Sequence, residues 1–451
     1  MSSEWPLVPL EALADEVTVG FVGTMADQYV EAGIPFLRSL NIEPFAVKKT
    51  DLKCISPEFH AKLKKSALRT GDVAIVRTGK PGTCAVIPEW LGEANCSDLV
   101  LVRCGPRLRP EFLSYWVNAA AANHIAANLV GAVQQHFNVS AAKRMLVACP
   151  PLAVQDNLIE LVASINDRIT LLRETNATLE AIAQALFKSW FVDFDPVRAK
   201  MEGRTPEGMD EATAALFPDG FETSELGEVP RGWRVCAVEE FADRVGMGPF
   251  GSNIKVETFV ESGIPVISGQ HLKQLLVEDN TFNFITHEHA ARLAKSCVQA
   301  GDLIFTHAGS IGQVSLLHKD AAFTSYVLSQ RQFFLRCNTE VMSPEWIALY
   351  FKSPAGQHQL LANTSQVGVP SIARPVSYLR SIRLVVPPPE LTQRFASIAG
   401  AINDRVMANR KQFGALTQIR DTLLPRLISG QLRLPEAQAA TEAALGGAFQ
   451  A

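Results

Sequence analysis

The amino-acid sequence repeats itself once, and this duplication constrains the fold more than any other feature. Motifs of the first half recur in the second half in the same order and at nearly constant spacing. The matched pairs are Trp5 and Trp233, Gly33-Ile34-Pro35 and Gly263-Ile264-Pro265, Gly71-Asp72 and Gly301-Asp302, Gly79 and Gly309, Gly82 and Gly312, Gly131 and Gly368, Pro150-Pro151 and Pro387-Pro388, and Ile165-Asn166-Asp167-Arg168 and Ile402-Asn403-Asp404-Arg405. Single motifs recur by chance, but a collinear series does not. We therefore predict two domains of one architecture.

Each half begins with a pattern that is typical of a mixed domain. The runs Val73-Ala74-Ile75-Val76 and Leu303-Ile304-Phe305 follow Gly-Asp turns and indicate strands. Helical patches over residues 110–128 and 344–361 interrupt the strands. The predicted fold class is α+β, with mixed α/β domains over residues 1–150 and 233–387 in a pseudo-twofold arrangement.

After each Pro-Pro pair the hydrophobic pattern changes to a heptad repeat. The first seam contains Leu158, Val162, Ile165, Ile169, Leu172, Asn176, Leu179, Ala183, Leu186 and Trp190, and the second contains Phe395, Ala399, Ile402, Val406, Asn409, Phe413, Leu416, Arg420, Leu423 and Leu427. Each amphipathic helix of about 35 residues would run about 50 Å, and neither can bury its stripe alone. We predict that the helices, within residues 151–194 and 388–434, pair as an antiparallel coiled coil.

One register of this coiled coil can be proposed from the two seam asparagines. Two facing asparagines satisfy each other's amides, whereas an asparagine opposite leucine stays unpaired, so we predict contact between Asn176 and Asn409. The other seam residues then meet apolar partners, except that Ile165 faces Arg420, whose charged end must reach water. The alternative is that either asparagine lies at a solvated edge.

The remaining segments show no periodic pattern. Residues 195–232 are rich in Pro, Gly and acidic residues, which is typical of a connector. Residues 435–451 are rich in alanine and lack an apolar stripe, which favours a disordered tail.

Composition bounds the class of protein. Hydrophobic residues make up 47% and charged residues 20%, as in ordinary folded proteins. No apolar run is long enough to cross a membrane and the first residues do not resemble a signal peptide, so we expect a cytoplasmic protein. The eight cysteines are scattered without a Cys-x-x-Cys pair, which supports neither a zinc cage nor a disulfide framework.

Catalytic motifs are missing from the sequence. There is no phosphate-binding loop, dinucleotide fingerprint or Asn-Pro-Pro-Tyr tetrapeptide. Residues 78–82 come nearest to a phosphate-binding loop, but they have the wrong glycine spacing and a proline where backbone amides would be needed. The only close histidine pair, His287 and His289, lacks a third ligand nearby and favours a strand or loop surface over a metal site. We expect no catalytic residue, metal or cofactor in this chain, and an enzyme is the weaker hypothesis.

Charge permits nucleic-acid binding without demanding it. A formal net charge of −4 argues mildly against phosphate contacts, which need Lys and Arg. The acidic excess, however, lies on the connecting segments, and the two large blocks are near neutral to slightly positive.

Four segments of the sequence form a joint signal: residues 150–155, the Ile-Asn-Asp-Arg helix, residues 187–196 and residues 423–432. Together they resemble the conserved regions of the specificity subunits of type I restriction-modification systems. The resemblance extends to about Leu434. The motifs are ordinary individually and specific jointly.

The resemblance implies a non-catalytic subunit in which each target-recognition domain reads one half of a bipartite, asymmetric site on double-stranded DNA. The paired helices would set the spacing and dock two modification subunits, which bind S-adenosylmethionine and methylate adenine. Restriction subunits would add ATP-driven translocation and cleavage. Two alternatives remain: a divergent methyltransferase or nuclease, and a coiled-coil adaptor that binds no nucleic acid.

We look for base-reading residues at polar positions where the halves differ inside the shared frame. Amides of Gln and Asn match adenine edges, Arg matches guanine, and glycines permit close approach to DNA. The candidates are Arg77, Lys80, Gln134, Gln135, His136 and Asn138 in the first half, and His307, Ser310, Gln366, Ser371 and Arg374 in the second. For each one the alternative is a solvated turn or a satisfied internal hydrogen bond.

Overall fold

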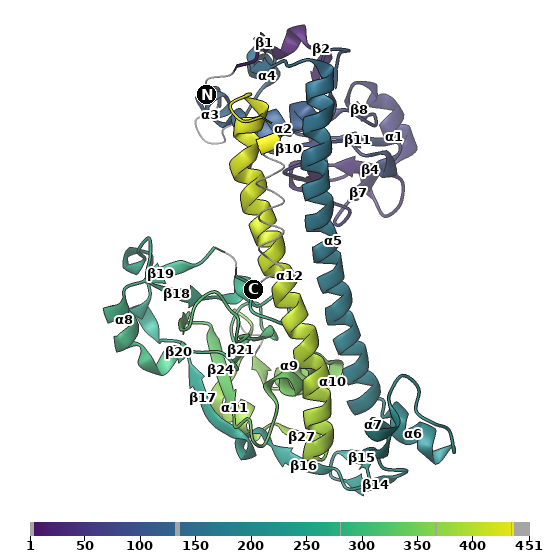
Figure 1. Cartoon of the computed structure of the whole chain (residues 1–451), viewed down its shortest axis with the longest axis vertical. Coiled ribbons are helices and arrows are strands. Elements are labelled where there is room, and N and C mark those ends of the chain that lie inside the picture. The colour runs from purple at the N-terminus through teal and green to yellow at the C-terminus, as the bar shows by residue number, and fades with distance from the viewer. Residues whose placement is uncertain (1–3, 131–135, 280, 366–367, 434, 437–451) are drawn as a thin grey trace. The chain divides into compact units, whose positions relative to one another are not determined.

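The computed structural model describes residues 4–130, 136–279, 281–365, 368–433 and 435–436. The chain divides into two compact units, of which unit 1 is Met1–Leu171 with Gln412–Ala451 and unit 2 is Leu172–Lys411. Each unit contains a sheet-rich body and part of each of two long helices, α5 (Leu152–Phe191) and α12 (Pro389–Ile428) (Figure 1). Unit 1 is therefore discontinuous in sequence, whereas unit 2 is one continuous segment.

The body of unit 1 is built on two sheets. The four-stranded sheet has the order β10-β9-β12-β2 and the five-stranded sheet the order β3-β7-β4-β11-β8, in which β11 runs parallel to β4. The bounds are β2 (Ala14–Val19), β3 (Tyr29–Val30), β4 (Ile34–Leu37), β7 (Lys53–Ile55), β8 (Ala67–Leu68), β9 (Val73–Val76), β10 (Cys84–Val86), β11 (Ala94–Cys96) and β12 (Leu99–Cys104), with β1 (Leu7–Pro9) paired to β13 (Leu146–Ala148) and β5 (Ile42–Glu43) to β6 (Ala46–Val47).

Unit 2 repeats the order of both sheets, except that its second sheet has no counterpart of β3. Its sheets have the orders β22-β21-β24-β17 and β19-β18-β23-β20, and β18 runs parallel to β23. The bounds are β16 (Arg234–Ala237), β17 (Ala242–Met247), β18 (Ile264–Ile267), β19 (Asn283–Ile285), β20 (Cys297–Val298), β21 (Leu303–Thr306), β22 (Val314–Leu316), β23 (Tyr326–Leu328), β24 (Gln332–Cys337) and β27 (Arg383–Val386), which pairs with β16. The match confirms the predicted duplication and the α+β class.

Short helices complete each unit. The patches that we predicted as single helices are each divided in two, and Ser353 ends one helix and caps the next through a hydrogen bond from the Gly356 amide. The helices are α1 (Pro57–Lys62), α2 (Pro110–Ala120), α3 (Ala122–Ala127) and α4 (Val139–Arg144) in unit 1, and α8 (His287–Arg292), α9 (Pro344–Lys352), α10 (Pro354–Leu361) and α11 (Pro375–Ser381) in unit 2, where β25 (Thr364–Ser365) also pairs with β26 (Ser371–Ile372).

A buried ion pair explains why Gly-Asp recurs before the central strand of each unit. Asp302 is fully buried and accepts the Gln299 amide at 2.8 Å. Its two carboxylate oxygens accept hydrogen bonds from Nε and Nη2 of Arg336 on β24 at 2.7 and 2.6 Å. In unit 1 Asp72 accepts the Arg69 amide at 3.0 Å and lies 3.3 Å from Arg103 on β12. Since an unpaired buried carboxylate is costly, each turn and its neighbouring strand depend on each other.

The seam of α5 and α12 is buried in both units. Leu158, Val162 and Ile165 lie in the core of unit 1, and Ala183, Phe187 and Trp190 lie in that of unit 2. The helices run antiparallel: in unit 2 the Trp190 and Phe395 rings lie 5.7 Å apart. Nδ2 of Asn409 donates to Oδ1 of Asn176 at 2.8 Å, and both side chains are buried. The structure thus brings the two seam asparagines into direct contact.

The expectation that Arg420 sends its charge into water is wrong. Its side chain is only 15% exposed, and its guanidinium donates to Oδ1 of Asn166 at 2.9 Å and lies 5.0 Å from the centre of the Phe45 ring. Sequence periodicity could not reveal the contact with Phe45, because this residue comes from the body of unit 1. The cation is held by the Asn166 amide oxygen, the Phe45 ring and the carboxylate of the neighbouring Asp421, which lies 2.8 Å away, instead of by solvent alone.

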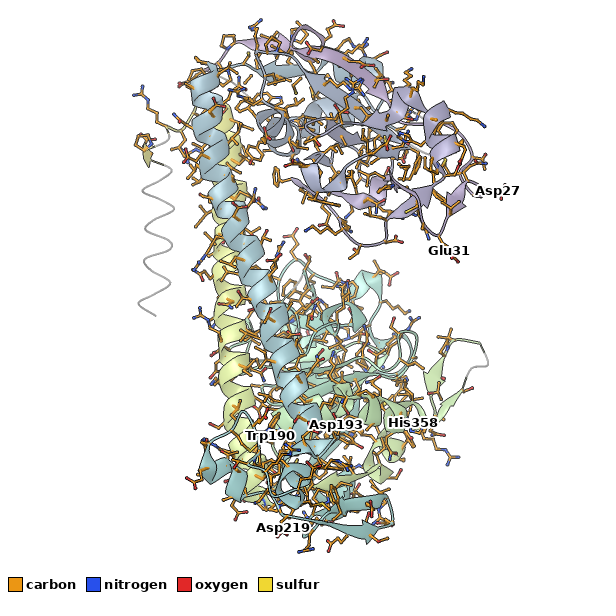
Figure 2. All side chains as sticks on the ribbon, turned by 90° about the vertical axis from the view of Figure 1, so that its right-hand side faces the viewer. Asp27, Glu31, Trp190, Asp193, Asp219 and His358 are labelled. Carbon is orange, nitrogen blue, oxygen red and sulfur yellow. The ribbon has the colours of Figure 1, made fainter. Side chains whose placement is uncertain are left out.

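Residues 195–232 fold against the end of α5. They form α6 (Asp195–Met201), α7 (Glu211–Ala215) and a hairpin of β14 (Phe221–Ser224) and β15 (Gly227–Pro230). Figure 2 labels Trp190 at the end of α5, and its ring lies 5.4 Å from that of Phe217. Buried Val197 and Phe217 join this segment to the core of unit 2. The connector is therefore a packed element, because a few apolar side chains outweigh its polar composition.

The Asn176–Asn409 hydrogen bond gives a direct prediction for stability. Asn409→Leu leaves the buried Asn176 amide without its asparagine partner, and we expect a loss of about 1–3 kcal/mol in the free energy of unfolding. The double variant N176L/N409L should recover most of this loss, because two leucines pack without an unsatisfied amide. Urea unfolding of the full chain measures both values. A double variant less stable than the single one would contradict the prediction.

Candidate nucleic-acid interface

The two candidate segments of unit 1 lie against each other. The amide of Phe137 donates to the carbonyl of Arg77 at 3.0 Å, and Nε of Arg77 donates to the carbonyl of Phe137 at 3.2 Å. The turn after β9 and the segment before α4 are therefore joined by a reciprocal pair of hydrogen bonds. Sequence spacing gave no sign of this adjacency, which depends on the tertiary fold.

Unit 2 makes the equivalent connection. The amide of Ile372 donates to the carbonyl of His307 at 2.8 Å, and the amide of Gly309 donates to the carbonyl of Pro370 at 3.0 Å. The turn after β21 and the segment before α11 thus form one continuous surface feature. The same pair of loops occupies the same place in both units.

The glycines of these turns are required by close packing. Gly82 and Gly312 adopt φ of +92° and +85°, where residues with a side chain are strained. A Cβ on Gly82 would lie 2.5 Å from Ile125, and one on Gly312 would lie 2.7 Å from the Gln357 side chain. The turns are therefore pressed against α3 and α10, which holds the polar residues beside them in place.

In unit 1 the candidate side chains divide into structural and exposed ones. The Arg77 side chain is only 16% exposed and lies 3.9 Å from the Asp98 carboxylate, while Oδ1 of Asn138 caps α4 by accepting the Ala141 amide at 2.8 Å. His136 is half-buried in a bridge with Val130, and Lys80 is exposed at the turn. Lys80 is thus the described candidate most accessible to a ligand. Gln134 and Gln135 lie outside the described residues.

In unit 2 the accessible candidates are Ser310 and Arg374, which are both exposed. Arg374 adopts φ of +47° immediately before α11. Ser371 lies in β26, where it pairs with Ser365 of β25. Nε2 of His307 lies 3.2 Å from the Gln330 carbonyl, and burial lowers the pKa of its ring. Gln366 lies outside the described residues.

Sequence reasoning missed a third loop beside these two. It follows β17 in unit 2 and β2 in unit 1, and its tips, Phe250 and Val22, are 74% and 70% exposed. Its first residue, Gly248, donates its amide to the Gln332 carbonyl at 2.8 Å, and a Cβ there would lie 1.9 Å from the Ser329 carbonyl. The run Gly248-Pro249-Phe250-Gly251 is a recognisable turn signal that could have identified this loop.

The predicted surroundings of His287 and His289 are wrong. Both lie in the first turn of α8, because the Thr286 hydroxyl caps this helix by accepting the His289 amide at 3.1 Å. A threonine before His-Glu-His is itself a helix-start signal. In the described part of the chain the group of three that could hold a metal is instead His318, Asp320 and Asp404.

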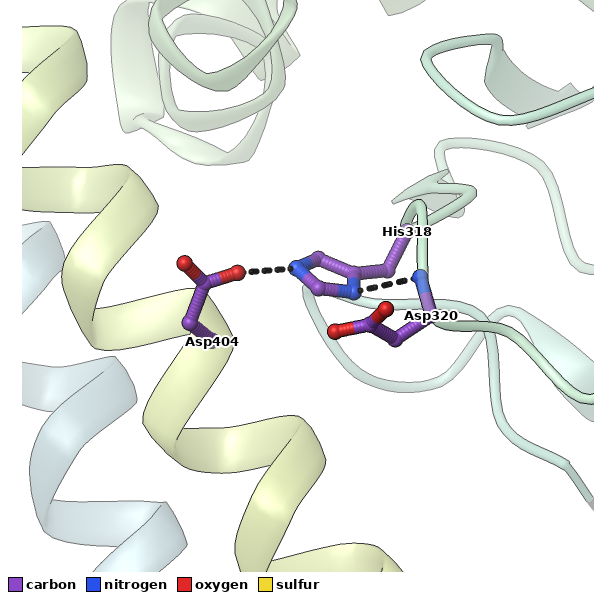
Figure 3. Close-up of side chains that lie close together, drawn as sticks. All are labelled: His318, Asp320 and Asp404. Carbon is purple, nitrogen blue, oxygen red and sulfur yellow. Dashed lines mark hydrogen bonds and ion pairs between the residues drawn. The ribbon is translucent and has the colours of Figure 1, made fainter. Parts of the chain in front are cut away.

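This second cluster joins the body of unit 2 to α12 (Figure 3). Nε2 of His318 lies 3.0 Å from Asp404, Nδ1 accepts the Asp320 amide at 3.1 Å, and Nζ of Lys319 lies 2.9 Å from Asp404. Both ring nitrogens and the carboxylate thus have partners, and the lysine ammonium supplies the positive charge. We call His318, Lys319, Asp320 and Asp404 the polar clasp, because their hydrogen bonds and ion pairs link the body of unit 2 to α12.

Comparison with known proteins supports the resemblance seen in the sequence. No protein-family model matches the chain. The specificity subunit of the type I restriction enzyme HindI from Haemophilus influenzae is 27% identical over 325 residues, which cover 63% of this chain and 68% of that protein. The MjaIX specificity subunit from Methanocaldococcus jannaschii is 23% identical over 306 residues, covering 66% of this chain and 63% of that protein.

The fold has a solved counterpart. The crystal structure of a type I restriction-modification S subunit from M. genitalium superposes with a TM-score of 0.52 and 13% identity, covering 94% of this chain and 96% of that one. The chain thus has the fold of that S subunit, with two sheet-rich bodies and two paired helices. In sequence it is similar to the specificity subunits of type I restriction-modification systems.

Within the described ranges, no helix combines the length and apolar character that a membrane crossing needs.

The clasp gives a titration prediction. Burial lowers the pKa of His318 below its ordinary 6.5, and Asp404 opposes this shift by favouring the charged ring. We therefore expect Asp404→Asn to lower the His318 pKa further, as measured from histidine ring signals by NMR, with the His318→Gln variant used to assign the signal. The neutral ring favours folding, so this contribution is present above pH 6.5 and is lost as the pH falls. A rise of the pKa in Asp404→Asn would contradict this account.

Proposed function

We propose that each unit reads one half of a bipartite, asymmetric site on double-stranded DNA. The observation that carries this proposal is that both units present the same pair of joined loops in the same frame but with different side chains. A shared frame with different polar groups suits two readers of related geometry and unlike sequence preference.

The exposed residues suggest different chemistry at the two half-sites. In unit 2 the guanidinium of Arg374 suits the acceptor pair of guanine, and the hydroxyl of Ser310 suits either base edge or phosphate. In unit 1 Lys80, beside a turn of two glycines, suits a phosphate contact. The amides of Gln134 and Gln135 suit adenine edges, and His136 and Asn138 take a supporting role in the same segment.

The paired helices are proposed to fix the spacing of the two readers and to dock two modification subunits. The burial of one helix face leaves apolar residues outside the seam, of which Leu171 and Ile182 on α5 are 53% and 45% exposed. In this proposal the modification subunits supply S-adenosylmethionine and adenine methylation, and restriction subunits supply ATP-driven cleavage. The complex would act where the DNA lies, in the cytoplasm.

The proposal is tested by assembling the full chain with its modification subunits and enriching bound sequences from random DNA. A bipartite motif that is methylated at adenine supports it. Enrichment of no sequence contradicts it and favours a coiled-coil adaptor. Methyl transfer by the isolated chain would favour the divergent enzyme instead.

Arg374→Ala should weaken recognition of the second half-site alone. Loss of one bidentate contact costs about 1–3 kcal/mol of discrimination, and Arg374 is exposed, so folding should be unaffected. Salt-controlled binding assays with targets altered in one half-site at a time measure the effect. Equal loss on every target would remove Arg374 from the base-reading residues.

Lys80→Ala should lower affinity uniformly across sequences and reduce the slope of log affinity against log salt by about one unit. This is the signature of one lost phosphate contact. Lys62→Ala is the matched control, because Lys62 is an exposed lysine of the same unit at the end of α1. A target-dependent effect of Lys80→Ala, or an equal effect of the control, would contradict the assignment.

A further inference from the structure

One position beside the candidate loops has opposite charge in the two units. It is occupied by Asp98, immediately before β12, in unit 1 and by Arg331, immediately before β24, in unit 2. Their backbone carbonyls make equivalent hydrogen bonds. The carbonyl of Asp98 accepts the Arg77 amide at 3.3 Å, and the carbonyl of Arg331 accepts the His307 amide at 2.9 Å. The two positions are therefore equivalent in the fold, and each lies beside the turn that carries candidate base-reading residues.

In unit 1 the charge at this position is used internally. Asp98 accepts hydrogen bonds from the hydroxyls of Ser39, at 3.0 Å, and Thr78, and its carboxylate lies 3.9 Å from Arg77. These three partners come from the loops around it. The carboxylate therefore holds the turn together and leaves little capacity for a ligand.

In unit 2 the charge at this position is available. Arg331 is exposed, and among the described residues no hydrogen bond or ion pair engages its guanidinium. Nη1 lies 3.1 Å from the point where a Cβ on Gly309 would be, so the guanidinium lies over that glycine. Gly309 in turn donates its amide to Pro370. Arg331 thus lies beside the turn after β21, and that turn is bonded to the segment that leads to Arg374.

The backbone that carries Arg331 is held firmly. The Gln330 side chain donates to the carbonyls of Gly251 and of Ile254, the latter at 3.1 Å, and the Ser329 amide donates to Ile267 at 2.8 Å. These bonds tie the residue to the third loop, whose tip is the exposed Phe250. These bonds fix the point from which the Arg331 side chain extends, and an arginine guanidinium carries paired donors that match the two acceptors of guanine.

We infer that Arg331 is a specificity-determining residue of unit 2 that recognises a guanine in the second half-site through O6 and N7. The inference rests on the proposed function and names a residue of the same surface. The absence of a side chain at Gly309 leaves the space in which the guanidinium lies. Asp98 cannot make this contact in unit 1, so this one position contributes to the difference between the half-sites.

The test uses the full chain assembled with its modification subunits and a set of duplexes in which each base pair of the enriched target is changed singly. For Arg331→Ala we expect a loss of about 5- to 150-fold at the target with guanine, which corresponds to 1–3 kcal/mol. The preference at that one base pair should disappear, and selectivity in the first half-site should be unchanged. Arg292→Ala, which removes an exposed arginine of α8, should leave every preference intact.

The outcomes separate this inference from the proposed function. If the wild-type complex selects no bipartite sequence, both are overturned. If the wild type selects one and Arg331→Ala keeps every base preference, only this inference is overturned. A uniform loss on all duplexes with a smaller salt slope also overturns it, because that result identifies a phosphate contact. Equal thermal midpoints of Arg331→Ala and wild type exclude misfolding as the cause.

Discussion

The burial of two facing apolar stripes is the interaction on which the rest of the structure depends. Neither α5 nor α12 could keep its stripe in water, and each unit takes part of its core from both helices. Apolar burial is non-directional, so it does not by itself choose an alignment. The buried hydrogen bond between Asn176 and Asn409 supplies that choice, because any shift leaves an amide unsatisfied.

The frame of each body is kept constant while its surface varies. The Asp72–Arg103 and Asp302–Arg336 pairs hold the same turn against the same strand in both units, and the buried strands follow the same order. Loops supported in this way can change residue type without altering the backbone that carries them. The opposite charges of Asp98 and Arg331 illustrate that freedom at one position.

Much of this architecture could be predicted from the sequence. Heptads, Gly-Asp turns and β-branched runs are local signals, so the helices, the central strands and the duplication followed directly. Contacts between distant segments could not be predicted, such as Phe45 over Arg420 or Phe137 against Arg77, because no local pattern encodes them. The equivalence of Asp98 and Arg331 was hidden by small insertions. The asparagine pair was accessible because a polar residue in an apolar seam has few satisfactory partners.

The discontinuity of unit 1 has a consequence for the order in which the chain can fold during synthesis. Unit 2 is one unbroken stretch and can close as soon as its last residue has left the ribosome. Unit 1 needs the final part of α12, and the Glu4 amide even bonds to the Ser429 carbonyl at 2.9 Å. Its first half must therefore wait, with Leu158 and Val162 uncovered, until the end of α12 has been translated. Unit 1 is thus begun before unit 2 and completed after it, and during this interval its uncovered apolar residues are open to chaperones and to aggregation.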